Sequence, residues 1–274
     1  MRTCYGYTEL LEDLLKLSEV YKDKISIKIT GTSVKGRLLP LIKMGGGNKK
    51  LLVAGAVHGR ESVTSAFIMK SLEELLKSGC EFAEKSLYVL PMVNPDGVEI
   101  FLKRDLPQVT VKDFKGELFK NNANNINLNA NFPFCFSKVP PKRQGGAKSA
   151  SEPEVKSLIK LCEKERFESA VSLHARGNCI FWRDYGNKAV KGDLELAKSF
   201  EQNCCFEIIS PTQKVEDYSG GFENWFRCRY RKPALCIELV KDEDISFSDM
   251  IINFEEAVIW EKTKNLLITY LNFS

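Results

Sequence analysis

The sequence predicts one α/β domain in which a mixed sheet lies between layers of helices. Segments with strand patterns alternate with segments of helical pattern along the 274 residues, as expected when helices cover the faces of a sheet. Several strand segments are apolar throughout, which is typical of strands covered on both faces. An apolar fraction of 43% and a charged fraction of 28% allow a sizeable core. No internal repeat or linker divides the chain.

The N-terminal half begins with a helix and continues into strands. Apolar residues from 7 to 21 recur at helical spacing, with Thr8 as the expected N-cap. A helix at 63–77 is expected to follow Ser62 as its N-cap, and the glycines at 45–47 predict a hairpin loop. The expected strands are residues 25–30 and 38–44, with a turn at 31–36 between them, and the buried strands 51–57 and 87–93.

The C-terminal half resumes the alternation after a polar, irregular stretch at 103–150. Ser151 is the expected N-cap of the next helix, because Glu152 and Glu154 place acids in its first turn. The segment from 204 to 221 shows no regular pattern. The remaining expected elements are strands at 169–173, 179–182 and 234–240 and helices at 193–203, 222–229 and 254–271.

Charge, cysteines and termini exclude several classes of protein. The net charge of +4 comes from interspersed acids and bases, which indicates a mixed solvated surface and not a nucleic-acid footprint. Nine scattered cysteines without a CxxC pair predict reduced, mostly buried thiols in place of a disulfide framework. The N-terminus has no apolar signal segment, and no apolar run is long enough for a membrane span. We therefore expect a cytoplasmic protein without a signal peptide or propeptide.

The two histidines of the chain both lie near the expected ends of buried strands. His58 follows the apolar run 51–57 and is three residues before Glu61, and His174 follows the strand expected at 169–173. Open α/β sheets place their sites at the carboxyl ends of strands. Zinc binds nitrogen and carboxylate oxygen, and catalytic sites supply three ligands and leave one position for water. Taken singly, each histidine has an ordinary alternative as a hydrogen-bonded residue, but together the three predict a metal site.

Glu238 lies inside the buried strand expected at 234–240. A carboxylate is unusual in such a strand unless it has a partner or a chemical task. An ion-pair partner is one explanation. A role beside the predicted metal site is the other.

The order and spacing of these residues resemble the zinc metallocarboxypeptidases of the carboxypeptidase A-like family. The resemblance covers nearly the whole chain and implies a carboxypeptidase A-like fold with a twisted mixed sheet of about eight strands. The matching segments are Gly31-Thr-Ser-x-x-Gly-Arg37, His58-x-Arg60-Glu61, Asn94-Pro-Asp-Gly97, Asn127-Leu-Asn129-Ala130-Asn131-Phe132, Ser172-Leu-His174, and Trp225 followed thirteen residues later by Glu238.

The resemblance implies metal-assisted hydrolysis of an amide bond. It assigns His58, Glu61 and His174 as ligands of one Zn²⁺ ion, which would activate a water and polarise the carbonyl. It assigns Glu238 as the group that takes the proton of that water and passes it to the leaving amine. The resemblance also implies that the Asn-rich stretch 121–131 is an active-site loop.

Two cations are also implied as catalytic residues. Arg60 is similar in position to a family arginine that contacts bound substrate. Lys120 follows Phe119 where the family usually has a cation after a tryptophan, and a cation there stabilises the developing oxyanion. Lysine keeps the charge but lacks the planar fork of arginine. A solvated loop lysine is the alternative for Lys120.

The informative departure from the family pattern is Ala130. Family members usually have Asn-Arg here, and the arginine clamps the terminal carboxylate of the substrate. This chain keeps Asn129 but has Ala130 next to it. The Asn-Ala-Asn variant is similar to bacterial members that cut γ-D-glutamyl-diaminopimelate bonds in peptidoglycan. Residues considered as replacements for the clamp are Arg176 and one of Arg227, Arg229 and Arg231, although each is also explained as a surface arginine.

The mobile tyrosine of the family has no direct counterpart. A gap-free alignment from Trp225 puts Glu216 at its position, and Tyr218 is two residues further along. We expect Tyr218 to reach the site through the loop before Gly220.

The favoured function is therefore hydrolysis of a γ-D-Glu-diaminopimelate bond in a peptidoglycan stem peptide. An ordinary carboxypeptidase that releases C-terminal amino acids from peptides is the first alternative. An aspartoacylase-like deacylase and a catalytically silent binding module are the others. The expected partner is a peptide or murein-peptide substrate, and neither nucleic acid nor a membrane.

Overall fold

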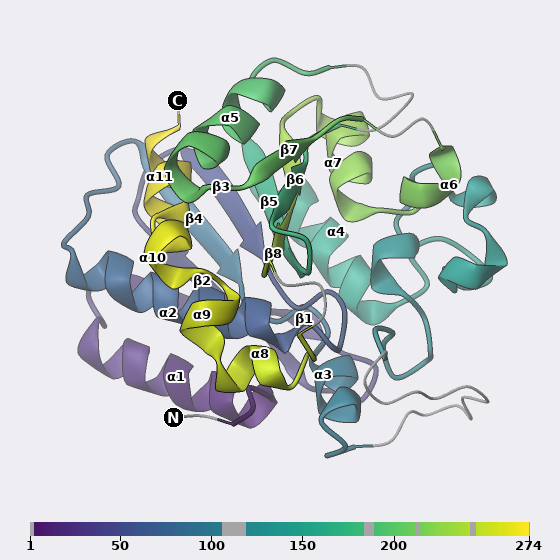
Figure 1. Cartoon of the computed structure of the whole chain (residues 1–274), viewed down its shortest axis with the longest axis horizontal. Helices are drawn as coiled ribbons and strands as arrows, with labels where there is room; N and C mark the ends of the chain where they lie inside the picture. Colours follow the sequence, from purple (N-terminus) through teal and green to yellow (C-terminus); the bar gives the residue numbers. More distant parts are fainter. Residues whose placement is uncertain (1–2, 106–118, 184–188, 212–213, 242–244, 274) are drawn as a thin grey trace.

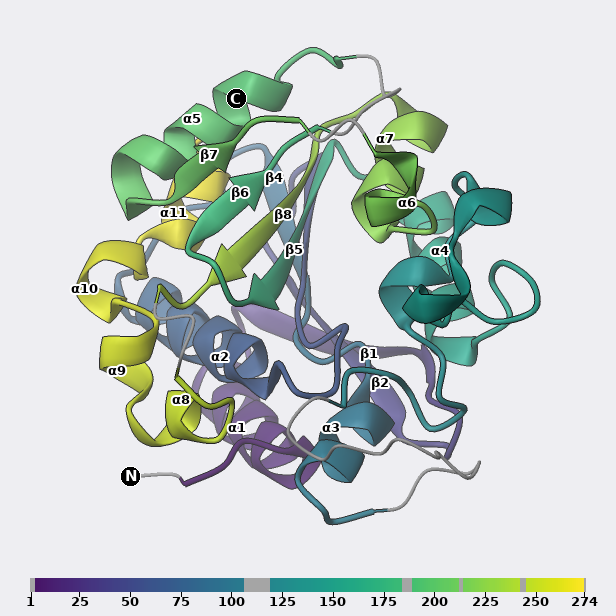
Figure 2. The same cartoon turned by 45° about the vertical axis from the view of Figure 1, so that its right-hand side comes forward.

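One mixed sheet organises the part of the chain that the computed structural model describes, which is residues 3–105, 119–183, 189–211, 214–241 and 245–273. Its eight strands follow the order β1-β2-β4-β3-β5-β8-β6-β7 (Figures 1 and 2). The strands are β1 (Ile25–Thr32), β2 (Leu38–Met44), β3 (Lys49–Ala54), β4 (Lys85–Leu90), β5 (Ser169–Ala175), β6 (Cys179–Phe181), β7 (Glu207–Ile209) and β8 (Ala234–Leu239). The expected mixed sheet of about eight strands between helices is confirmed.

The central strands are parallel and the outer pairings are mostly antiparallel. β3 is parallel to β4 and to β5, and β5 is parallel to β8. β1 with β2, β2 with β4, and β6 with β8 pair antiparallel, whereas β6 and β7 are parallel. The carboxyl ends of β3, β5 and β8 therefore meet at one edge of the sheet, where open α/β sheets form their sites.

Helices cover both faces of the sheet, so alternate strand residues enter two different cores. Leu51 and Val53 belong to the larger core, and Leu52 and Ala54 to the smaller one. The larger core also takes α1 (Tyr7–Val20), α2 (Ser62–Lys77), α5 (Asp193–Cys204) and α8 to α11, which are Asp249–Ile252, Phe254–Ala257, Trp260–Thr263 and Leu266–Asn272. The smaller core takes α4 (Pro153–Glu165) and α7 (Phe222–Tyr230), which Figure 2 shows on the opposite side of the sheet.

The hairpin predicted at residues 45–47 is wrong. β2 and β3 are not neighbours, because β4 lies between them. The loop instead packs against the chain that enters β4. A Cβ at Gly47 would lie 1.8 Å from the carbonyl carbon of Glu84, and Gly45 has a φ of +74°. The glycines are therefore needed for a close backbone approach and a left-handed conformation, which local sequence does not distinguish from a hairpin turn.

The single C-terminal helix predicted at 254–271 is also wrong. The segment forms three short helices, α9, α10 and α11, and Ile259 between the first two has a φ of +50°. A straight helix buries one stripe of side chains, but the buried residues here do not share one stripe. They are Ala257, Val258, Trp260, Thr263, Leu266, Leu267, Thr269, Tyr270 and Leu271.

Other departures are smaller. β7 and α6 (Val215–Tyr218) lie within the segment expected to be irregular. Ser62 and Ser151 do not cap their helices, since Glu61 and Glu152 occupy the N-cap positions of α2 and α4. All nine cysteines are free thiols, but the expectation that most are buried is wrong, because three are buried and three are exposed.

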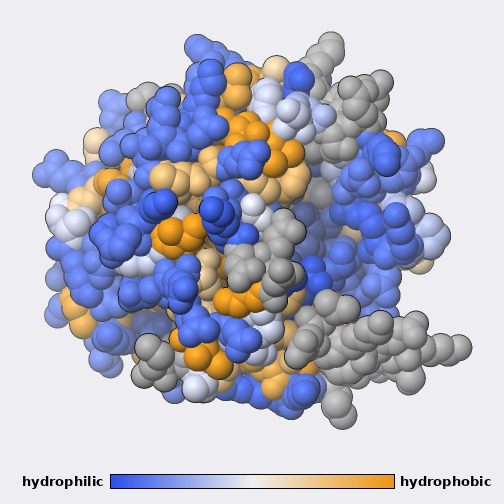
Figure 3. Space-filling view, viewed as in Figure 1, coloured by the Kyte–Doolittle hydropathy of each residue, from blue (hydrophilic) through white to orange (hydrophobic). Residues whose placement is uncertain are grey.

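The surface is mixed in character, as its interspersed charges predict. Figure 3 shows that one face is mostly hydrophilic, with smaller apolar patches between the polar side chains. No helix among the described residues is both long enough and apolar enough to cross a membrane.

Candidate metal centre and active site

The segment that carries His58 and Glu61 is fixed by its neighbours beyond the end of β3. The Asn94 side chain caps α3 (Pro95–Phe101) by accepting from the Gly97 N–H at 2.9 Å. The same side chain donates to the carbonyl oxygens of Val57 at 3.2 Å and Asn121 at 3.1 Å. Asn94 therefore ties the chain before His58 to the Asn-rich loop, which accounts for the placement of the Asn94-Pro-Asp-Gly97 motif.

A close backbone approach holds the same segment from the other side. A Cβ at Gly59 would lie 2.4 Å from the carbonyl oxygen of Gly97. The backbone at residue 59 is therefore in direct contact with the backbone of α3, which only a glycine allows. The Gly59 N–H also donates to the Lys120 carbonyl at 3.1 Å. Position 59 is thus packed between α3 and the Asn-rich loop, and His58 projects from a constrained backbone.

His174 lies within β5 and not after it, because that strand continues to Ala175. The correction matters for the site. The parallel register pairs His174 with Glu238 of β8, so the two side chains lie on adjacent strands at the same level. The register places the third candidate ligand beside the candidate general base.

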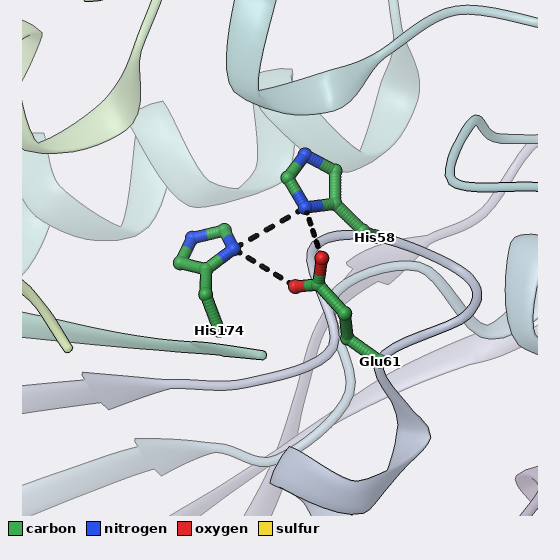
Figure 4. Close-up of side chains that lie close together, drawn as sticks. All are labelled: His58, Glu61 and His174. Carbon is green, nitrogen blue, oxygen red and sulfur yellow. Dashed lines mark hydrogen bonds and ion pairs between the residues drawn. The ribbon is translucent and has the colours of Figure 1, made fainter. Parts of the chain in front are cut away.

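His58, Glu61 and His174 converge on one point (Figure 4). The Glu61 Oε1 atom is 2.8 Å from His58 Nδ1, and its Oε2 atom is 3.0 Å from His174 Nδ1. The two Nδ1 atoms are 3.3 Å apart. All three ligand atoms lie within 4.8 Å of one another, and Glu61 and His174 are buried.

This cluster fits a zinc ion. Two ring nitrogens that face each other at 3.3 Å need a proton or another cation between them. Two imidazole nitrogens and one carboxylate form the ligand set that catalytic zinc sites use. The arrangement therefore favours a cation held by all three residues.

The outer ring nitrogen of each histidine faces a polar side chain. His58 Nε2 is 3.1 Å from Asn127 Oδ1, and His174 Nε2 is 3.7 Å from Glu223 Oε1. Glu223 also accepts a hydrogen bond from the Ser172 hydroxyl. A hydrogen-bonding partner of the kind that Asn127 provides fixes the tautomer and ring orientation of a metal-binding histidine. Asn127 is thus a positioning residue for His58, whereas Glu223 places a negative charge near the His174 ring.

Burial and charge act differently on the three candidate ligands. Burial lowers the pKa of His58. For His174, burial acts in the same direction, but the nearby carboxylates of Glu223 and Glu61 raise its pKa well above the ordinary value. Burial opposes ionisation of Glu61, but the charge of His58 and hydrogen bonds from both rings hold the pKa of Glu61 below its ordinary value. The Glu61 carboxylate is therefore ionised and available as a ligand.

Glu238 faces a pocket of about 330 Å³ beside the cluster. Its Oε2 atom is buried and has no hydrogen-bond partner among the described residues. Burial raises the pKa of this carboxyl to about 8. The pocket is also lined by Asn129, Arg143, Tyr218 and Glu223. A carboxyl group at a pocket wall without a partner is a candidate for proton transfer to a bound molecule.

The two predicted cations lie next to the candidate metal residues. Arg60 Nε is 3.8 Å from Glu61 Oε1, and its guanidinium stacks on Phe247 with 4.7 Å to the ring centroid. Lys120 is half-buried, and burial and then the charge of Arg60 lower the pKa of its ammonium group. The structure therefore brings both cations to this edge of the sheet.

The predicted substrate-binding residues divide into two groups. Asn129 and Tyr218 line the pocket, and Asn129 Oδ1 also accepts from the Phe222 N–H at 2.8 Å. Ala130 is fully buried and is not part of the pocket wall. Arg176 donates to the Ile245 carbonyl at 2.8 Å and stacks on Phe247, also away from the pocket.

The other arginines considered as a carboxylate clamp are not placed for that role. Arg227 reaches the pocket wall, but it is buried and both its terminal nitrogens bind the Asp193 carboxylate. Arg229 and Arg231 are exposed and do not line the pocket. Sequence reasoning missed Arg143, which does line it. Arg143 lies in an irregular segment and belongs to no motif, so the sequence carries no signal for it.

Two carboxylates of the α4 N-terminus hold the Asn-rich loop. Glu152 Oε2 accepts from the Asn122 side chain at 2.7 Å and from the Asn124 side chain at 2.9 Å. Glu154 accepts from Asn122 at 3.3 Å and from the Val34 N–H at 3.1 Å. The loop that carries Asn127 and Asn129 is therefore anchored to α4 and to the turn before β2.

The buried anchor Glu154 is expected to make stability depend on pH. Burial raises its pKa from 4.5 to about 7, so the folded state binds a proton that the unfolded state releases. Protonated Glu154 therefore contributes about 3 kcal/mol to the free energy of unfolding below pH 4.5, and this contribution is lost as the pH rises through about 7. Urea unfolding of the parent and the Glu154→Gln variant between pH 4.5 and 8 measures this loss of stability. The variant should show the smaller loss, and an equal loss in both proteins would contradict the assignment.

The fold and this cluster define an α/β protein with a metal-dependent hydrolase type of site. Residues 10–247 match the zinc carboxypeptidase family (Peptidase_M14), and the chain belongs to that family. Membership implies one catalytic zinc ion. The family resemblance and the zinc prediction are thereby confirmed.

The similar proteins include a γ-D-glutamyl-diamino acid endopeptidase and several carboxypeptidases. Gamma-D-glutamyl-L-diamino acid endopeptidase 1 of Lysinibacillus sphaericus is 25% identical over 266 residues, which are 86% of this chain and 65% of that protein. The chain thus spans slightly less than two thirds of the length of this relative. The carboxypeptidase N catalytic chain of Mus musculus is 24% identical over 200 residues, which are 62% of this chain and 42% of that one.

Solved structures confirm the fold. Carboxypeptidase A from Helicoverpa armigera superposes with a TM-score of 0.75 at 18% identity, over 97% of this chain and 73% of that one. Murein-tripeptide amidase MpaA from Escherichia coli O157 has a TM-score of 0.58 at 20% identity, over 88% and 91%. At these sequence identities, the structural similarity shows a shared fold and nothing further.

Proposed function

We propose that this protein is a zinc peptidase that hydrolyses the amide bond between γ-D-glutamate and a diamino acid in peptidoglycan stem peptides. The observation that carries the hydrolase assignment is the convergence of His58, Glu61 and His174 beside Glu238, whose buried oxygen faces the pocket. The substrate assignment is supported by the relative from Lysinibacillus sphaericus, which is named for that bond, and by Ala130.

Each residue has a defined part in this proposal. Bound zinc would supply Lewis-acid chemistry, which lowers the pKa of a water and polarises a carbonyl. Glu238 takes a proton from the attacking water and delivers it to the nitrogen of the leaving amine. Lys120 stabilises the negative charge that develops on the carbonyl oxygen. Arg60 contacts the bound substrate. Tyr218 and Asn129 bind the substrate from the pocket wall.

The pocket suits a substrate with charges of both signs. Its wall includes the cations Arg143 and Arg183 and the acids Asp217 and Glu223. A stem peptide that ends in diaminopimelate carries several carboxylates and a free amine. Complementary charges of this kind favour correct over incorrect substrates.

An ordinary carboxypeptidase is the second candidate function. Several relatives carry that name, including carboxypeptidase N, carboxypeptidase M and carboxypeptidase B. This alternative requires another cation to bind the terminal carboxylate, because Ala130 stands where the family usually has an arginine. It would act on peptides with ordinary side chains and free C-termini.

A paired hydrolysis assay of the zinc-loaded protein tests the proposal. One substrate is L-Ala-γ-D-Glu-diaminopimelate, and the other is a panel of ordinary peptides with free C-termini. Cleavage of the first alone is the expected result. Release of C-terminal residues from the panel alone would assign an ordinary carboxypeptidase, and cleavage of neither would favour a deacylase or a silent binding module.

A further inference from the structure

Two arginines stack on one phenylalanine ring beside the candidate metal residues. The Arg60 Cζ atom is 4.7 Å from the centroid of the Phe247 ring, and the Arg176 Cζ atom is 5.0 Å from it. Arg60 directly precedes Glu61, and Arg176 follows His174 by two residues. The segments that supply candidate ligands therefore also carry two cations to one ring.

The two guanidinium groups are oriented but are not neutralised by a close carboxylate. Arg176 Nη1 donates to the Ile245 carbonyl at 2.8 Å, and a carbonyl oxygen carries no full charge. Among the described residues, the one ion pair of either arginine joins Arg60 Nε to Glu61 Oε1 at 3.8 Å, and Glu61 is itself a candidate metal ligand. Both arginines are partly exposed. Stacked, oriented guanidinium groups are suited to a carboxylate, which arginine binds through two parallel hydrogen bonds.

This pair of arginines lies on a different side of the sheet edge from the pocket at Glu238. Phe247 belongs to the larger core, with α8, whereas the pocket is lined by residues of α7, which packs in the smaller core. Figure 2 shows α7 and α8 on opposite sides of the sheet. Neither arginine lines that pocket. Because Glu238 delivers a proton to the leaving amine, the leaving group occupies the pocket and the acyl part of a bound peptide extends towards the arginines.

The proposed substrate has a carboxylate on its acyl side. In a γ-linked D-glutamyl residue the side-chain carboxyl forms the amide bond that is cut, so the α-carboxyl group stays free. Only two methylene groups and Cα separate this carboxylate from the cut carbonyl. A neutral residue joined through its own α-carboxyl has no charge at this place. A cation on the acyl side would therefore distinguish the γ-linked peptide from most ordinary peptides.

We propose that Arg176, together with Arg60, binds the free α-carboxylate of the γ-D-glutamyl residue and so selects γ-linked peptides. This inference rests on the proposed function, because it requires a peptide with its cut bond at the metal residues. The sequence suggests Arg176 as a clamp for the terminal carboxylate of the leaving group. The structure places it on the other side of the cut bond, where it contacts the acyl residue.

The test compares acyl residues that differ only in the α-carboxylate. Zinc-loaded parent and Arg176→Ala proteins are assayed with L-Ala-γ-D-Glu-diaminopimelate and with the same peptide carrying D-isoglutamine, in which that carboxylate is an amide. We expect Arg176→Ala to raise KM for the acid by about 10- to 100-fold, because hydrogen bonds to charged groups have energies of that order. Its kcat should change little, and KM for the amide should stay that of the parent. Arg176→Lys should recover part of the loss, and Arg229→Ala, which changes an exposed arginine of α7, should behave as the parent protein.

Binding provides a readout that does not depend on turnover. Titration calorimetry in a Glu238→Gln background compares the affinities for the acid and the amide. The background protein should bind the acid more tightly, and Arg176→Ala should remove that difference. Equal losses for both peptides in Arg176→Ala would mean that the side chain acts only in holding the Ile245 carbonyl, and a difference that survives undiminished would assign the carboxylate to another cation. Either result overturns the inference.

The two proposals can fail separately. If the parent cleaves the acid and the amide equally well, the proposed function stands and the Arg176 assignment fails. If the parent cleaves only ordinary peptides, the proposed substrate fails. A preference among those peptides for glutamate over glutamine in the acyl residue, lost in Arg176→Ala, would then still support the role of Arg176 in binding a carboxylate, and the absence of such a preference would overturn both proposals.

Discussion

Replacement of Glu238 by glutamine is expected to reduce kcat by about 100- to 10,000-fold, the range that general acid–base groups contribute. The buried Oε2 atom has no partner among the described residues and faces the pocket, so a proton can pass between it and a bound molecule. Glutamine keeps the volume but cannot accept a proton. Initial rates with the preferred peptide and the zinc content of each protein are the measurements.

The metal content separates this expectation from a loss of the site. Glu238→Gln should bind zinc as the parent does, because Glu238 is not one of the three converging ligands. Glu256→Gln, which changes an exposed carboxylate on α9, is the matched control and should keep full activity. Activity of Glu238→Gln close to that of the parent would contradict the general-base assignment.

Removal of zinc is expected to abolish hydrolysis and to lower the melting temperature. Without the ion, two histidines and a carboxylate converge within 4.8 Å in a largely buried place. A ligand present at 1,000 times its Kd stabilises the folded state by about 4 kcal/mol, which corresponds to about 10 °C for a chain of this size. Chelation followed by zinc addition, with activity and thermal unfolding recorded at each stage, is the measurement.

The ligand assignment makes this test specific. Glu61→Ala should show no activity, and added zinc should leave its melting temperature nearly unchanged. A parent protein that hydrolyses peptide at full rate after complete removal of metal would exclude the mechanism. A Glu61→Ala variant that gains as much stability from zinc as the parent would exclude Glu61 as a ligand.

Local patterns were sufficient for much of the fold. Continuous apolar runs located β3, β4, β5 and β8 within a few residues, since strands covered on both faces must be apolar. They failed where contacts distant in sequence decide the backbone. The glycines at 45–47 serve a close approach to the chain before β4, and the segment 254–271 bends to bury more than one stripe.

The amino-acid sequence by itself determined which residue types are available for chemistry: two histidines in motif positions, Glu61 beside the first, and Glu238 in an apolar strand. Tertiary structure alone decided how they meet. The register of β5 with β8 puts His174 opposite Glu238, and three backbone carbonyls place Arg143 beside Asn129. Strand register and loop packing depend on contacts between segments far apart in the chain, and no local pattern of residues records them.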